Sequence, residues 1–113
     1  MQEYSIKKGF KDGLDDRIKD GLVKFFEVKP EEKNGHYKIK YGSFTMLEAW
    51  INEKGNMVAI DTVSDAALYE KHSEKEADDI VLDTNSRFRK YLEFVTGYNT
   101  KERKKKAAEA VKK

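Results

Sequence analysis

The sequence predicts an α+β fold in which helices pack on one face of an antiparallel sheet. Residues 13–27 and 76–95 carry apolar side chains at the three- and four-residue spacing of amphipathic helices. Residues 36–63 instead alternate with a period of two, and Gly42-Ser43 and Lys54-Gly55-Asn56 divide them into three strands of a meander. With a further short strand near the N-terminus, the expected order is β-α-β-β-β-α-α, and 113 residues suffice for one such domain.

The first two elements are a strand at residues 3–7 and the helix at 13–27. Asp12 is the expected N-cap of this helix, and Pro30 prevents the helix from continuing. Gly21 lies in mid-helix, where glycine costs about 1 kcal/mol relative to alanine. We therefore expect either a neighbouring backbone packed closely at Gly21 or a locally weak helix.

The turns of the meander suggest a register for its strands. Two-residue loops would place Tyr41 opposite Phe44, Ile39 opposite Met46, Trp50 opposite Ala59 and Ile51 opposite Val58. One face would then receive the helices, with Tyr37, Ile39, Tyr41, Phe44, Met46, Trp50, Ala59 and Val63. The other face would carry Lys38, Lys40, Thr45, Leu47, Ala49, Ile51, Val58, Ile60 and Thr62. Its centre is apolar enough to suggest an interaction surface.

Residues 65–75 are polar and read as a loop or a weak helical turn, and the longest predicted helix follows at 76–95. Its 4-3 apolar spacing favours packing on the sheet over a dimerising seam. Gly97 suits a left-handed C-cap, and Asn99 with Glu102 resembles a capping box that starts a basic helix through residue 111. We expect one compact domain over residues 1–97 and a basic tail over 98–113, mobile beyond about Lys106.

Composition excludes several classes of function. The chain has no cysteine, so disulfides, thiolate catalysis and cysteine-bearing metal sites are absent. No uninterrupted apolar run is longer than four residues, as at residues 57–60, which is far too short to cross a bilayer. These observations predict a cytoplasmic protein with no membrane partner and no cofactor, either a monomer or a weak homodimer.

Charge is distributed unevenly along the chain. Residues 98–113 carry seven basic and two acidic side chains, a net of +5, which leaves 16 basic minus 19 acidic, or −3, for residues 1–97. A basic tail of this kind neutralises phosphates, although terminal lysines also simply aid solubility. The candidate residues for binding nucleic acid or an acidic protein surface are Lys38, Lys40, Lys101, Arg103, Lys104, Lys105 and Lys106.

Two pairs of side chains are candidates for chemistry. In the predicted register Glu48 and Asp61 face each other beside Tyr37, and opposed carboxylates in an apolar site share a proton, as acid/base pairs do. A three-residue turn would separate them, and a rim position reached by a basic side chain is the structural alternative. His72 and Glu76 have the spacing of two metal ligands, but a solvated acidic stretch explains them without a third ligand.

Several segments together resemble a known family. They are Tyr4-Ser5-Ile6-Lys7-Lys8-Gly9-Phe10, Ala49-Trp50-Ile51 and Thr96-Gly97-Tyr98-Asn99-Thr100-Lys101-Glu102-Arg103-Lys104-Lys105. With them the chain resembles small archaeal proteins that are classed only as a domain of unknown function. The resemblance implies an archaeal, cytoplasmic protein with a compact α+β fold, and it supplies no activity and no site residues.

The leading hypothesis is a small non-enzymatic binding module that engages nucleic acid through its basic C-terminal segment. One alternative is a protein–protein adaptor that uses the second apolar face of the sheet. The other is an enzyme built on Glu48 and Asp61.

Overall fold

The computed structural model of the protein describes residues 2–10, 12–103 and 105. Its strands and helices follow one another as β1 (Gln2–Ser5), α1 (Leu14–Phe26), β2 (Glu31–Lys33), β3 (His36–Tyr41), β4 (Phe44–Ile51), β5 (Met57–Ser64), α2 (Leu68–Lys71) and α3 (Glu74–Thr96). A helical turn at residues 100–103 follows α3.

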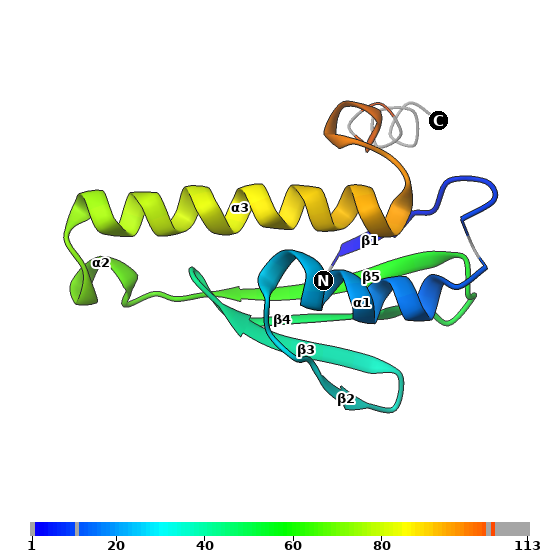
Figure 1. Ribbon diagram of the computed structural model, residues 1–113, viewed down its shortest axis with the longest axis horizontal. Coiled ribbons are helices and arrows are strands. Elements are labelled where there is room, and N and C mark those ends of the chain that lie inside the picture. Colours follow the sequence, from blue (N-terminus) through cyan, green and yellow to red (C-terminus); the bar gives the residue numbers. More distant parts are fainter. Residues whose placement is uncertain (1, 11, 104, 106–113) are drawn as a thin grey trace.

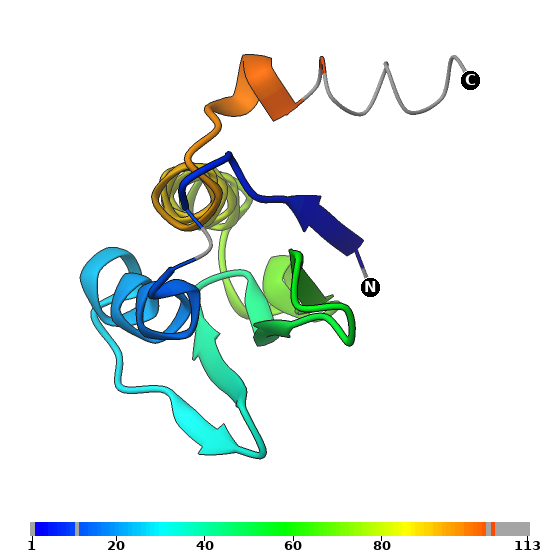
Figure 2. The ribbon, with the colours of Figure 1, turned by 90° about the vertical axis from the view of Figure 1, so that its right-hand side faces the viewer.

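The five strands form one antiparallel sheet in the order β1-β5-β4-β3-β2. Helix α3 runs along the long axis of the molecule, and α1 lies beside it (Figure 1). Viewed down α3, both helices lie on the same side of the sheet, and no helix of the described residues covers the other face (Figure 2). The predicted α+β class is confirmed, with helices α1 and α3 as its second layer.

Strand β2 is absent from the predicted order. Its three residues are all exposed, so they carry no apolar alternation that would mark a strand. The strand pairs with β3 through the turn at Asn34 and Gly35, both of which have positive φ angles. Asn-Gly is a strong hairpin signal, and it was the one indication of β2 in the sequence.

The predicted register is half correct. Trp50 lies opposite Ala59 and Ile51 opposite Val58, as expected. Between β3 and β4, however, an irregularity after Ile39 pairs this residue with Leu47, although Tyr41 still pairs with Phe44. A bulge shifts every following side chain to the other face of its strand.

The shifted register reverses the predicted faces of β5 and of β4 beyond Phe44, while Phe44 itself stays on the helix side as predicted. The helices cover the side chains that were expected to form the second apolar face, and Leu47, Val58 and Ile60 are at most 3% exposed. The prediction of an exposed apolar face for a protein partner is therefore wrong, because α1 and α3 bury this face. The face turned away from the helices, here called the open face, carries Trp50, Met46 and Val63 instead.

Helix α1 packs against α3 at Gly21. A Cβ added to Gly21 would lie 2.8 Å and 2.9 Å from ring atoms of Tyr91 and 3.0 Å from Phe94. Tyr91 is fully buried, and its hydroxyl donates a hydrogen bond of 3.0 Å to the backbone oxygen of Ile18. The mid-helix glycine is thus explained by close packing, from side chains of α3 rather than from a neighbouring backbone.

The ends of the helices test the predicted caps. Gly97 ends α3 in the left-handed conformation, as predicted. Asn99 and Glu102 form the predicted capping box, since each side chain accepts a hydrogen bond from the other's backbone N–H. Asp12 does not cap α1, because Gly13 takes the N-cap position in a left-handed conformation without a side-chain bond. The predicted mobility beyond Lys106 lies outside the described residues.

Candidate binding surfaces

A row of neighbouring residues crosses the open face. His36 of β3 lies against Trp50 of β4, Trp50 lies opposite Ala59 of β5, and Ala59 lies opposite Glu3 of β1. The rings of His36 and Trp50 stack with centroids 4.4 Å apart and planes 8° from parallel. This spacing is close to the distance between neighbouring strands, so the two rings are displaced along the direction that joins the strands.

The acidic pair lies in the next row of the same face. Glu48 and Asp61 are opposed across β4 and β5, as the predicted register required. They lie beside Trp50, whereas Tyr37 lies on the opposite face, where its hydroxyl donates a 2.7 Å hydrogen bond to Asp15. The predicted neighbourhood of the pair is therefore wrong, although the pairing itself is confirmed.

Glu48 has a close partner that the sequence did not indicate. Nδ1 of His36 lies 2.6 Å from a carboxylate oxygen of Glu48. The imidazole and the carboxyl group are joined by a hydrogen bond at this distance. The hydrogen bond orients the imidazole while Trp50 supports its ring face. The enzyme hypothesis for Glu48 and Asp61 stays a prediction.

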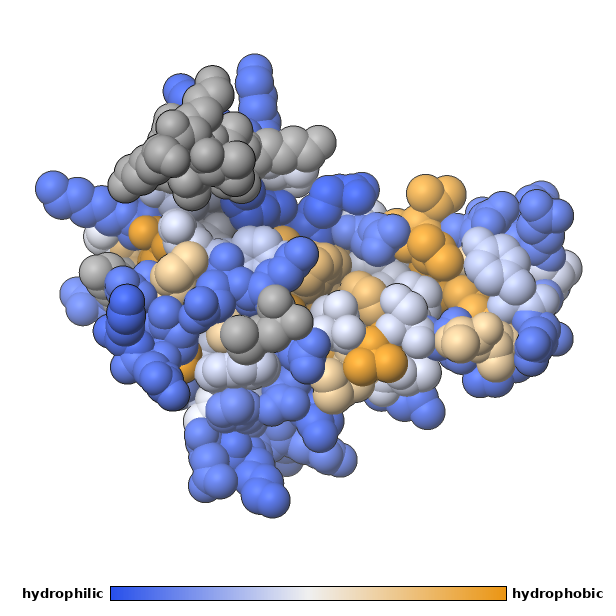
Figure 3. All heavy atoms as spheres, turned by 180° about the vertical axis from the view of Figure 1, so that it is seen from behind, coloured by the Kyte–Doolittle hydropathy of each residue, from blue (hydrophilic) through white to orange (hydrophobic). Residues whose placement is uncertain are grey.

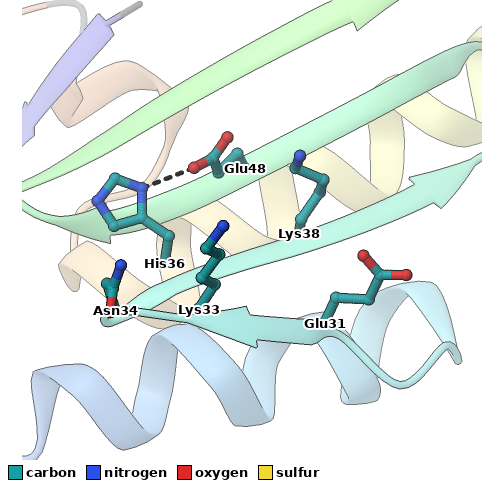
Figure 4. A pocket seen from close by; sticks show the side chains of 6 residues that line it. All are labelled: Glu31, Lys33, Asn34, His36, Lys38 and Glu48. Atoms are coloured by element: carbon teal, nitrogen blue, oxygen red, sulfur yellow. Dashed lines mark hydrogen bonds and ion pairs between the residues drawn. The ribbon is translucent and has the colours of Figure 1, made fainter.

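A shallow hollow of about 250 Å³ adjoins His36 and Glu48. Figure 4 shows its side chains on strands β2, β3 and β4 and the hydrogen bond from His36 to Glu48. Cations and carboxylates alternate around it, and the six residues are Glu31, Lys33, Asn34, His36, Lys38 and Glu48. The mixture of charges gives the hollow no single sign, so it does not select a polyanion.

Basic side chains gather on the helix side of the molecule. Arg89 and Lys90 of α3 share a hollow of about 340 Å³ with Lys101, near the start of the basic segment. All three are exposed. Lys105 is also exposed, one helical turn after Lys101. Here these four residues are called the basic surface.

The structure divides the predicted binding residues between two faces. Lys38 and Lys40 lie on β3, and Lys38 lines the hollow of the open face. The segment with Lys101 and Lys105 follows α3 on the helix side of the sheet (Figure 2). One ligand surface therefore does not hold both groups. Lys104 and Lys106 lie outside the described residues.

Arg103 has a structural role. Its guanidinium donates hydrogen bonds to the backbone oxygen of Tyr98 and to the hydroxyl of Thr100. Burial lowers the pKa of Arg103, and the nearby positive charge of Arg89 acts in the same direction. Because two of its five donors are bonded within the protein, Arg103 helps to hold the turn that carries Lys101.

Exposed apolar side chains are few and scattered in the part of the chain that the structure describes. The large ones there are Val23, Val63, Tyr69 and Leu82. Seen from behind, hydrophobic residues form small areas among hydrophilic ones (Figure 3). No helix in the described part of the chain is both long and apolar enough to cross a membrane.

The remaining predicted cluster does not assemble into a metal site. Nδ1 of His72 lies 3.8 Å from a carboxylate oxygen of Glu76. This distance is that of an ion pair between the two side chains. Among residues 2–10, 12–103 and 105, no three potential metal-ligating side chains come together.

Sequence reasoning missed four residues of these surfaces. His36 and Trp50 become neighbours only once the β3–β4 register is known, so their stacking had no local signal. Arg89 and Lys90 belong to a helix whose sequence signal is the spacing of its apolar side chains. Their exposed charge was visible, but their proximity to Lys101 depends on how the chain turns at Gly97.

A family model described as Domain of unknown function (DUF5611) matches residues 1–109. No curated protein and no solved structure matches the chain. Because the match covers nearly the entire sequence and agrees with the resemblance inferred from its motifs, the chain belongs to the DUF5611 family.

Proposed function

We propose that the protein is a non-enzymatic binding module that engages nucleic acid through the basic surface. The observation that carries the proposal is the shared hollow, in which Arg89 and Lys90 of α3 meet Lys101 of the basic segment. Three exposed cations there face a single acidic side chain, Glu93. Archaeal origin and a cytoplasmic location stay predictions from the sequence.

The physical argument concerns phosphate charge. Lys and Arg side chains that neutralise phosphates release condensed counterions, so binding weakens steeply as salt rises. A surface anchored on α3 holds part of this charge in place, because α3 is packed into the core through Tyr91 and Val95. The capping box at Asn99 and Glu102 further orients the turn that carries Lys101. Phosphate binding of this kind gives affinity without reading a base sequence.

The test is a titration of labelled single-stranded RNA and duplex DNA with the full chain, followed by fluorescence anisotropy over a range of salt concentrations. The double variant Arg89→Gln/Lys101→Gln is expected to bind more weakly. Its salt slope should fall by about 0.7 to 0.9 for each phosphate that the variant no longer neutralises. Truncation after Gly97, which removes the segment of net charge +5, should have a larger effect.

The matched control is Lys38→Gln/Lys40→Gln, which removes the same amount of charge from β3 of the sheet. It should leave binding within about twofold of the original, because these lysines do not adjoin the basic surface. Absence of binding by the full chain at low salt would overturn the proposal, as would an equal reduction of binding in the control variant. Tighter binding to polyglutamate than to either nucleic acid would assign the surface to an acidic protein partner instead.

A further inference from the structure

The open face has a second hollow on the far side of Trp50 from His36. Its volume is about 410 Å³, and Trp50, Met57 and Ala59 provide its apolar lining. Neighbouring strand positions explain why it is there. His36 covers one face of the indole, and the next residue in the same row, Ala59, has only a methyl group. Trp50 is therefore stacked on a ring on the side of His36, and no ring stands next to it on the side of Ala59.

The wall of this hollow is held by a hydrogen-bonded turn. The side-chain oxygen of Asn52 accepts hydrogen bonds from the backbone N–H groups of Asn56 and Met57, at 3.0 Å and 3.1 Å. The backbone N–H of Asn52 donates in turn to the oxygen of Met57. The turn between β4 and β5 is thus closed from both sides, and the hollow requires little ordering before it takes a ligand.

The electrostatics of the hollow favour a cation. Glu3 and Glu53 border it, against the single basic side chain of Lys54. The indole face adds the negative side of an aromatic quadrupole, which attracts cations most strongly for tryptophan. A phosphate group would be repelled by the two carboxylates, so a nucleotide does not fit the charge of this hollow as well as it fits the basic surface.

A planar cation uses both features at once. A guanidinium group stacks on an aromatic ring through its face and donates hydrogen bonds to carboxylates through its edge. An ammonium group donates to carboxylates but has no face to stack. We propose that the hollow beside Trp50 binds the guanidinium group of an arginine side chain presented by a partner protein. This site is separate from the basic surface, so the proposal does not depend on whether the protein binds nucleic acid.

The experiment uses the full chain and N-acetyl-arginine amide as the probe. Trp50 is the only tryptophan, so its fluorescence and its indole N–H resonance report on ligands bound beside it, and the variants below distinguish this hollow from the one beside His36. The expected result is a saturable change in both signals. N-acetyl-lysine amide should bind about threefold or more weakly, since it lacks a planar group to stack. Adenosine monophosphate should bind more weakly still.

Two variants and one control test the assignment. Glu3→Gln lies at an exposed edge-strand position and should weaken binding by about twofold to fivefold through the removal of one charge. Ala59 is 1% exposed, so the larger side chain of Ala59→Leu has to extend into the hollow, and it should abolish the change at Trp50. Glu31→Gln removes the same charge beside the other hollow and should have no effect.

Three results would overturn the proposal. They are no saturable change with the arginine amide, equal or tighter binding of adenosine monophosphate, and a reduction of binding in Glu31→Gln as large as that in Glu3→Gln. If Ala59→Leu fails to fold, the comparison of Glu3→Gln with Glu31→Gln decides whether the arginine amide binds in this hollow.

Discussion

At Gly21, helix propensity and side-chain packing have opposite effects on the stability of an alanine variant. Gly21→Ala gains about 1 kcal/mol of helix propensity. Its new methyl group would lie within 3.0 Å of the rings of Tyr91 and Phe94. Tyr91 is fully buried and hydrogen-bonded to Ile18, so its ring has little room to move. We expect a net decrease of about 1 to 2 kcal/mol in the free energy of unfolding, because overpacking costs more than propensity returns.

Urea denaturation measures the effect of Gly21→Ala. Lys19→Ala is the matched control, since it lies on the exposed side of the same helix and should change stability by about 0.5 kcal/mol or less. A more stable Gly21→Ala variant would show that the packing between α1 and α3 yields easily to an added methyl group.

Buried tyrosines make stability depend on alkaline pH. Burial raises the pKa of Tyr37, and its hydrogen bonds to Asp15 and Glu32 raise it further. Burial likewise raises the pKa of Tyr91. Near pH 10 the unfolded chain releases these protons while the folded protein retains them, so stability falls as the pH rises above about 10.

The measurement is the free energy of unfolding from pH 8 to 11. The original protein should lose up to about 1.4 kcal/mol per pH unit for each of the two tyrosines above pH 10. Tyr37→Phe should show a shallower fall, and its stability at pH 7 should be lower by about 1 kcal/mol because the hydrogen bond to Asp15 is removed. An unchanged slope would show that Tyr37 ionises freely in the folded state.

At the scale of elements, Thr84 joins α3 to the β3–β4 turn. Its hydroxyl donates a 2.7 Å hydrogen bond to the oxygen of Ile80 and accepts one of 3.1 Å from the backbone N–H of Ser43. Both Thr84 and Ser43 are buried. Gly42 fits against the same hydroxyl, since a Cβ there would approach it to 2.2 Å.

Thr84→Val tests this junction with almost no change in shape. The variant leaves the buried N–H of Ser43 without its acceptor, so we expect a decrease of about 1 to 3 kcal/mol in the free energy of unfolding. Thr84→Ser should recover part of this stability. Thr45→Val, at an exposed position where the hydroxyl bonds to the oxygen of Val63, is the control and should cost about 0.5 kcal/mol or less. Equal decreases in the two valine variants would argue against the junction.

At the scale of the whole molecule, the two faces differ in charge and in structure. The helix side carries the basic surface on α3 and the segment after it. The open face carries the stacked His36 and Trp50 between two shallow hollows with carboxylates in their walls. Because the two proposed binding surfaces lie on opposite sides of the sheet, variants of one surface serve as controls for the other. A partner protein and a nucleic acid would also not compete for the same residues.

Local signals in the sequence determined the fold class and the extents of most elements. The periods of α1, α3 and β3 to β5 follow from the alternation of apolar side chains, and the cap at Gly97 and the capping box at Asn99 follow from the residues themselves. Such features depend on neighbours within a few positions along the chain, which is why residue type alone predicts them.

Tertiary structure decided which face of the sheet is buried and which residues form each binding surface. An irregularity between Ile39 and Tyr41 of β3, matched by one between Phe44 and Met46 of β4, reversed the faces of β5 and of β4 beyond Phe44. It buried Leu47 and Val58 and left Trp50 beside His36 on the open face. The physical reason is that side chains alternate with a period of two, so a shift of one residue exchanges the faces. The chain turn at Gly97, likewise, brings Lys101 to Arg89 and Lys90, a proximity that no spacing along the sequence specifies.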